Sequence, residues 1–168
     1  MTNPLLEAWN TPFQVPPFAK ITAANFAPAL EIAMQDDLAN IDAIAHNPEP
    51  ATFANTIEAL ETTSALMHKV LSSFYAMVGA HTNPELDALM REFSPKLAAH
   101  GAKISGNKAL FKRIETLWSS KDGLGLNDEQ MMLLKDHYLG FVRSGAALTG
   151  DAEARLTDIK SRLSVLCT

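Results

Sequence analysis

Apolar side chains recur at spacings of three, four and seven residues through most of this 168-residue chain, and this helical period restricts its fold more than any other feature. In no segment do apolar and polar residues alternate strictly, as they would along a half-buried strand. Apolar residues make up 47% of the chain, enough for one domain with a substantial core. We therefore predict an all-α protein, an antiparallel helical bundle of about six helices.

Capping residues, prolines and glycines indicate where these helices begin and end. The first is expected over 24–46, and the second over 52–79 as one uninterrupted helix of about 40 Å. Four more are expected over 84–105, 107–118, 127–145 and from 150 onward. We expect Thr82 and Glu85 to form the capping box of the third helix. The predicted inward face of the first helix consists of Leu30, Met34, Leu38, Ile41 and Ala45.

Residues 1–20 differ from the rest, because four prolines interrupt a segment that also contains Trp9, Phe13 and Phe18. Such a segment favours an extended arm that packs on the bundle, and not a disordered tail. We predict an arm over 1–20 and a helical domain over 21–168. The apolar period is still running at Thr168, which predicts that the 168 residues are the front part of a longer protein.

The charge pattern excludes several classes of partner. The net charge is −5 and acidic and basic residues are interspersed, so the sequence offers no basic patch for nucleic acid or for anionic lipid. The longest apolar run, 71–80, is far shorter than the roughly 20 residues of a membrane span, and the N-terminus lacks the pattern of a signal peptide. We predict a soluble protein. The single cysteine, Cys167, rules out an internal disulfide.

The segment 80–101 contains two histidines and several carboxylates, the residue types that bind metals. His81 precedes the predicted helix, whereas His100 lies about 24 Å along it, so the two cannot share one ion. We predict that His100 is a histidine at the edge of the core with a hydrogen bond.

No other candidate group forms a recognisable site. Glu58 and Glu61 are interpreted as a solvated helix face, and the adjacent Asp36 and Asp37 as surface charge. Nothing in the sequence marks Cys167 as a nucleophile. Histidines occur singly, and no H-E-x-x-H pattern of a zinc protease is present; they are His46, His68, His81, His100 and His137. The sequence therefore predicts no catalytic, cofactor-binding or metal-binding residue in this chain.

Several stretches, in order along the chain, resemble the start of the thimet oligopeptidase and peptidyl-dipeptidase family of zinc metallopeptidases. They are NPLLEAWNTPFQVPPFAKI (3–21), FAPALEIAM (26–34), FANTIEALE (53–61), HTNPELDALMREFSPKLAAH (81–100), NKALFKRIETLW (107–118), LGLNDEQMMLLKDHYLGFVRSGAAL (124–148) and LSVLCT (163–168). The combination is specific, although no single stretch is. The HTNPEL block and the Gly145-Ala146 pair resemble the peptidyl-dipeptidase branch most, and oligopeptidase A second.

The resemblance implies the N-terminal helical domain of a neurolysin-like metallopeptidase, truncated before the catalytic domain. Zinc is expected in the full-length protein, held by residues further along, and no position of this chain has such a role. By this analogy the chain is a wall of a channel that admits short peptides to a cytoplasmic enzyme, and it contacts its own catalytic domain.

Two readings of the function remain open. The chain is either a catalytically silent fragment of such a peptidase, or a self-standing helical protein-interaction module. In the first case, apolar residues on the second and sixth helices that the missing part would cover are expected to allow self-association of the fragment.

Overall fold

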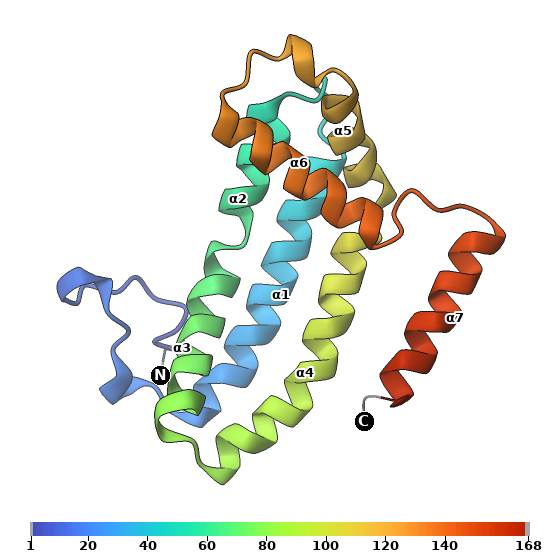
Figure 1. The fold of residues 1–168 in the computed structure, drawn as a ribbon. Helices are drawn as coiled ribbons and strands as arrows, with labels where there is room; N and C mark the ends of the chain where they lie inside the picture. The colour runs from blue at the N-terminus through green and yellow to red at the C-terminus, as the bar shows by residue number, and fades with distance from the viewer. Residues whose placement is uncertain (1, 167–168) are drawn as a thin grey trace. The chain divides into compact units, whose positions relative to one another are not determined.

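The computed structural model describes residues 2–166, except for the side chains of 157, 160, 161 and 163–166. Helices, short helical turns and loops account for all of these residues, and no strand occurs among them, which confirms the predicted all-α class (Figure 1). The α-helices are α1 (Ala23–Ala45), α2 (Ala59–Thr63), α3 (Ala65–His81), α4 (Pro84–Ser105), α5 (Lys108–Ser119), α6 (Asp128–Arg143) and α7 (Asp151–Leu166). Shorter elements are η1 (Pro12–Gln14), η2 (Phe18–Lys20), the π-helix η3 (Phe53–Glu58) and η4 (Lys121–Gly123).

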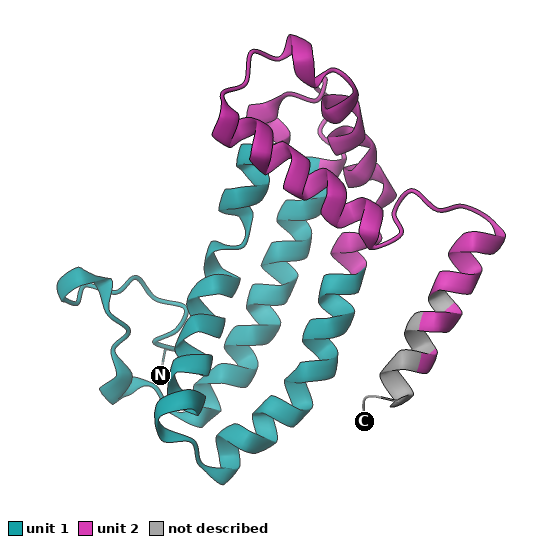
Figure 2. Cartoon of the chain, viewed as in Figure 1, with its two compact units in different colours: residues 1–44, 58–102 teal, residues 45–57, 103–168 magenta. Residues whose placement is uncertain are grey.

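The chain forms two compact units (Figure 2). Unit 1 comprises residues 1–44 and 58–102, and unit 2 comprises 45–57 and 103–168. The boundary that the sequence predicts between an arm and a helical domain, at residue 20, stays a prediction.

Unit 1 has its core between α1, α3 and α4, which run side by side with alternating direction (Figures 1 and 2). Phe26 of α1 meets Phe74 of α3 edge to face, with ring centroids 5.1 Å apart. Phe93 of α4 is fully buried in the same cluster. Leu5 is also fully buried there, so the segment before α1 contributes to this core.

The predicted continuous second helix is wrong, because the segment is divided into η3, α2 and α3. The break lies at Ser64, whose φ of −90° and ψ of 23° leave the helical region. The preceding Thr62 and Thr63 donate their hydroxyls to carbonyls one turn earlier, a pattern that weakens and bends helices. Ser64 itself turns its hydroxyl to the Asp37 carboxylate, 2.6 Å away.

The caps of the later helices follow the sequence closely, with one exception. Asn107 accepts from the backbone N–H of Leu110 at the start of α5, and Asn127 forms a reciprocal capping box with Gln130 at the start of α6. Both helices therefore begin where the sequence predicts them, at the positions after 107 and 127. The predicted cap at Thr82 is wrong, because α4 begins at Pro84 and the preceding Asn83 accepts from the Leu86 N–H at 2.9 Å.

Unit 2 is built on the packing of α5 against α6 through stacked aromatic rings. Tyr138 stacks on Trp118 and on Phe111, with centroids 5.0 and 6.1 Å apart, and Phe111 also stacks on Phe141. The start of α7 is linked to α5 by an ion pair between Lys108 and Glu153, 2.7 Å apart.

The loop of unit 2 that follows α1 is held by Arg113 of α5. Its guanidinium donates to the carbonyls of Asn47 and Glu49, both at 3.0 Å, and to the side chain of Asn55 at 2.8 Å. Asn55 in turn exchanges hydrogen bonds with Thr52 at the start of η3. One side chain therefore fixes the whole connection between α1 and η3.

None of the helices in the described part of the chain is long and apolar enough to cross a membrane. Cys167 and the side chains of Leu163 and Leu166 lie outside the part of the chain that the structure describes.

Candidate functional site

Asp37, Ser64 and His100 form a buried polar cluster in unit 1. Asp37 is 3% exposed and His100 is 9% exposed. The imidazole Nε2 of His100 donates to Oδ2 of Asp37 at 2.7 Å, and the hydroxyl of Ser64 donates to Oδ1 at 2.6 Å. Both carboxylate oxygens are therefore satisfied by side chains from other elements, as a buried charge requires.

The cluster joins three parts of the chain that are far apart in sequence. Asp37 lies on α1, His100 on α4, and Ser64 at the break between α2 and α3. His100 is thus a core-edge histidine with a hydrogen bond, as predicted. The interpretation of Asp37 as surface charge is wrong, whereas its neighbour Asp36 is exposed.

The burial of Asp37 follows from a rotation of the inward face of α1 relative to the predicted one. The predicted inward residues Leu30, Ile41 and Ala45 are buried. The full set of buried residues of α1 is Ala23, Phe26, Ala29, Leu30, Ala33, Asp37, Ile41, Ile44 and Ala45. The predicted Met34 and Leu38 lie at its edge and are only half-buried. The buried face includes Ala29 and Ala33. Alanine is only weakly hydrophobic, so the periodicity was assigned from the larger Met34 and Leu38 instead. Asp37 stands four residues after Ala33 and four before Ile41, and this spacing was the signal that could have located it.

The arrangement does not form a nucleophilic triad. In such a triad the serine bonds to the imidazole, which removes its proton, while the carboxylate orients the opposite ring nitrogen. Here Ser64 and His100 both donate to the carboxylate, so the imidazole is not placed to remove the serine proton. The other ring nitrogen of His100, Nδ1, is buried without a hydrogen-bond partner among the described residues. The geometry fits a polar clamp between helices better than a catalytic group.

The other histidines and carboxylates remain dispersed. No group of three or more His, Cys, Asp or Glu side chains with metal-binding geometry occurs in the described part of the chain. His81 lies at the exposed end of α3, and α4 is a continuous helix between Pro84 and His100. Glu58 and Glu61 are exposed, as expected for a solvated face. The predicted lack of a metal site in the chain stays a prediction.

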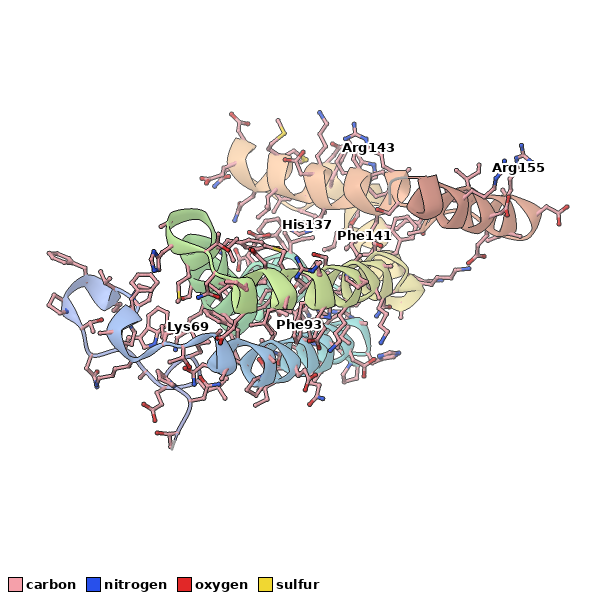
Figure 3. All side chains as sticks on the ribbon, turned by 90° about the horizontal axis from the view of Figure 1, so that it is seen from below. Lys69, Phe93, His137, Phe141, Arg143 and Arg155 are labelled. Atoms are coloured by element: carbon pink, nitrogen blue, oxygen red, sulfur yellow. The ribbon has the colours of Figure 1, made fainter. Side chains whose placement is uncertain are left out.

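A second polar feature of unit 1 is the anchorage of the N-terminal arm on α3 by Lys69. The Lys69 ammonium donates to the backbone carbonyl of Glu7 and lies 4.4 Å from the centre of the Trp9 ring. Trp9 donates its indole N–H to the Pro4 carbonyl at 2.9 Å. Burial lowers the pKa of Lys69, and the charge of Glu7 partly opposes this effect. Figure 3 shows Lys69 where the blue arm meets the green α3.

A groove of about 640 Å³ opens beside this anchor. Its lining includes Trp9 and Asn10 from the arm and His68, Lys69 and Ser72 from α3. The Ser72 hydroxyl lies 3.4 Å from Nε2 of His68. No local pattern in the sequence indicates this groove, because it forms only when the arm folds back on α3.

The far end of the arm is exposed. Phe13 has 99% of its side chain in solvent, so the expectation that it packs on the bundle is wrong. Its backbone φ is 57°, and that of Gln14 is 56°. For side-chain-bearing residues this left-handed conformation costs on the order of 1–3 kcal/mol each.

The chain is similar to known peptidases over nearly its whole length. It is 38% identical over 165 residues to a dipeptidyl carboxypeptidase of Salmonella typhimurium, an alignment that covers 98% of this chain and 24% of that protein. The corresponding protein of Escherichia coli is 37% identical over 164 residues, again with 98% and 24% coverage. Oligopeptidase A of Escherichia coli is 27% identical over 166 residues, 99% of this chain and 24% of the relative. No family model matches the chain.

The chain thus spans about a quarter of the length of these relatives, and the match lies in their N-terminal part. Identity is higher to the two dipeptidyl carboxypeptidases than to oligopeptidase A, in the predicted order. The chain is therefore similar in sequence to the N-terminal part of dipeptidyl carboxypeptidases and, at lower identity, of oligopeptidase A.

Proposed function

We propose that this chain is the N-terminal helical part of a longer cytoplasmic zinc metallopeptidase that hydrolyses short peptides, and that it forms a wall of the substrate channel without contributing to the chemistry. One observation carries the proposal: 98% of the chain aligns at 38% identity with a dipeptidyl carboxypeptidase, yet covers only 24% of it. The higher identity to this branch favours the release of dipeptides over other cleavage patterns.

The side chains of the described residues support a structural role. Hydrolysis of an amide at neutral pH requires an activated nucleophile or a metal-bound water with a lowered pKa. The buried carboxylate–imidazole pair of Asp37 and His100 joins α1 to α4. In this proposal the zinc is held by residues outside the 168, and the chain supplies a rigid helical surface.

The rigidity that a channel wall requires comes from the contacts inside each unit. In unit 1 the Asp37 cluster and the Phe26–Phe74 contact fix the three long helices against one another. In unit 2 the stacked rings of α5 and α6 and the Arg113 clamp have the same effect. A wall that restricts access must hold its shape when peptides of different length approach it.

The test compares the full-length protein with the isolated 168-residue chain. Each is incubated with a short unstructured peptide and with a folded protein substrate, with and without a chelator. We expect the full-length protein to release dipeptides from the short peptide only, and to lose this activity with chelator. The isolated chain should be inactive and should retain no stoichiometric zinc after dialysis.

Three results would contradict the proposal. Turnover by the isolated chain at the rate of the full-length protein would place a catalytic site within the 168 residues. An open reading frame that stops after Thr168 would favour a self-standing interaction module. Equal cleavage of folded and unfolded substrates by the full-length protein would refute the restricting wall but leave the peptidase activity standing.

A further inference from the structure

The exposed end of the N-terminal arm presents an apolar surface that unit 1 does not use. We call Phe13, Val15 and Phe18 the arm tip; their side chains are 99, 48 and 42% exposed. The stretch from Thr11 to Phe18 contains no charged residue. Single exposed apolar side chains are common, but a fully exposed phenylalanine beside two further exposed apolar residues is typical of an interaction site.

The loop that carries the arm tip is built to hold this conformation. The Thr11 hydroxyl donates to the Val15 carbonyl at 2.5 Å, and the Gln14 N–H donates to the Thr11 carbonyl at 3.0 Å. Pro12 opens the short turn η1, and Pro16-Pro17 keep the chain extended after it. The loop is therefore preorganised, which reduces the entropy that is lost on binding.

The backbone strain at Phe13 and Gln14 also supports a role of the arm tip in binding. Two consecutive side-chain-bearing residues with φ near +57° are uncommon, and such strain is retained where it positions a functional side chain. Within unit 1 the conformation gains nothing for Phe13, because its ring is left in water. A surface outside this chain would supply the apolar contacts that the Phe13 ring lacks here.

The length of the aligned relative suggests where such a surface lies. The alignment with the dipeptidyl carboxypeptidase takes in 165 of the 168 residues, so the arm tip lies within the aligned part of a protein about four times as long. A tip without charge fits an apolar pocket of the same polypeptide, which stays at high effective concentration. We propose that the arm tip docks, through Phe13, into an apolar pocket formed by the part of the protein beyond residue 168. This inference rests on the proposed function, which supplies that part.

The test is photo-crosslinking in the full-length protein. Phe13, Val15 and Phe18 are replaced one at a time by p-benzoylphenylalanine, and Gln35, an exposed polar residue of α1, is the control position. The sites are exposed in unit 1, so the probes do not disturb its core. After irradiation of the dilute protein, crosslinks are mapped by peptide mass spectrometry, and a mixture of isotopically heavy and light protein distinguishes links within one chain from links between two.

We expect Phe13 and at least one of the other two positions to link to residues beyond 168 of the same chain, while Gln35 does not. Links between heavy and light chains would overturn the inference in favour of a second copy as the occupant. Links confined to residues 1–168, or no links from any of the three positions, would show that the arm tip is not docked. Peptidase activity, assayed on the same samples before irradiation, tests the proposed function separately.

Discussion

Replacement of His100 by alanine should be among the most destabilising single changes in unit 1. The substitution leaves the Asp37 carboxylate, 3% exposed, with Ser64 as its remaining side-chain donor. The loss of the imidazole donor leaves one oxygen of a buried carboxylate without its partner, and such a loss costs about 3 kcal/mol or more. Ser64→Ala removes one hydrogen bond to the same charge, and its expected cost is about 1.5–3 kcal/mol.

A double variant of Asp37 and His100 separates the free energy of their hydrogen bond from the free energy lost with side-chain packing. When Asp37→Ala and His100→Ala are combined, no uncompensated charge remains, so the double variant should lose less stability than the sum of the two single losses. We expect a coupling free energy of about 2–3 kcal/mol, at the upper end of values for neighbouring residues. A matched control is Asp36→Ala, which changes the exposed neighbouring carboxylate and should alter stability by less than about 0.5 kcal/mol.

The assay needs a probe of unit 1 alone, and the two tryptophans provide it. Trp9 lies in unit 1 and Trp118 in unit 2, so fluorescence in a Trp118→Phe background follows unit 1 during urea unfolding. The reasoning is refuted if His100→Ala costs less than about 1 kcal/mol, or if the two alanine substitutions are additive.

Four further predictions test local contacts, two in each unit. Gly145→Ala should destabilise unit 2 by about 1–2 kcal/mol, because φ at this position is +91° and a Cβ would lie 2.1 Å from Leu156 Cδ2. The control is Gly140→Ala in the open interior of α6, which should be neutral or stabilising by up to about 1 kcal/mol. Thermal unfolding of both variants measures the difference. Arg113→Lys should increase hydrogen exchange in the loop before η3, since an ammonium cannot reproduce the three directed hydrogen bonds, and unchanged exchange would refute the clamp. Lys69→Ala should make the arm more sensitive to limited proteolysis. Because the pKa of Lys69 is lowered in the folded state, its contribution to stability should rise as the pH increases from its folded pKa to its unfolded pKa, and this rise should be absent from the alanine variant.

Features that depend on a few neighbouring residues were predicted correctly from the sequence. The all-α class follows from the apolar period, and the starts of α5 and α6 follow from Asn107 and from Asn127 with Gln130. A cap is made by a side chain and a backbone N–H three residues apart, so the sequence contains all of its parts. The error at Thr82 is of the same local kind, since Asn83 was one residue closer to the proline that begins α4.

The features that the sequence did not reveal depend on partners far along the chain. The helix break at Ser64 and the burial of Asp37 depend on the same contact. The Ser64 hydroxyl donates to the Asp37 carboxylate, 27 residues away in sequence, and the same carboxylate accepts from His100, 63 residues away. A periodicity argument assigns a carboxylate to the surface, since an unpaired charge is costly to bury. Only the packing of α1, α3 and α4 brings the two donors to Asp37, and these donors make its burial possible. The sequence by itself therefore determined the all-α class, the starts of α5 and α6 and the similarity to peptidases. The tertiary structure decided where the second predicted helix breaks and which faces are buried, because burial of a polar group depends on partners that folding brings together.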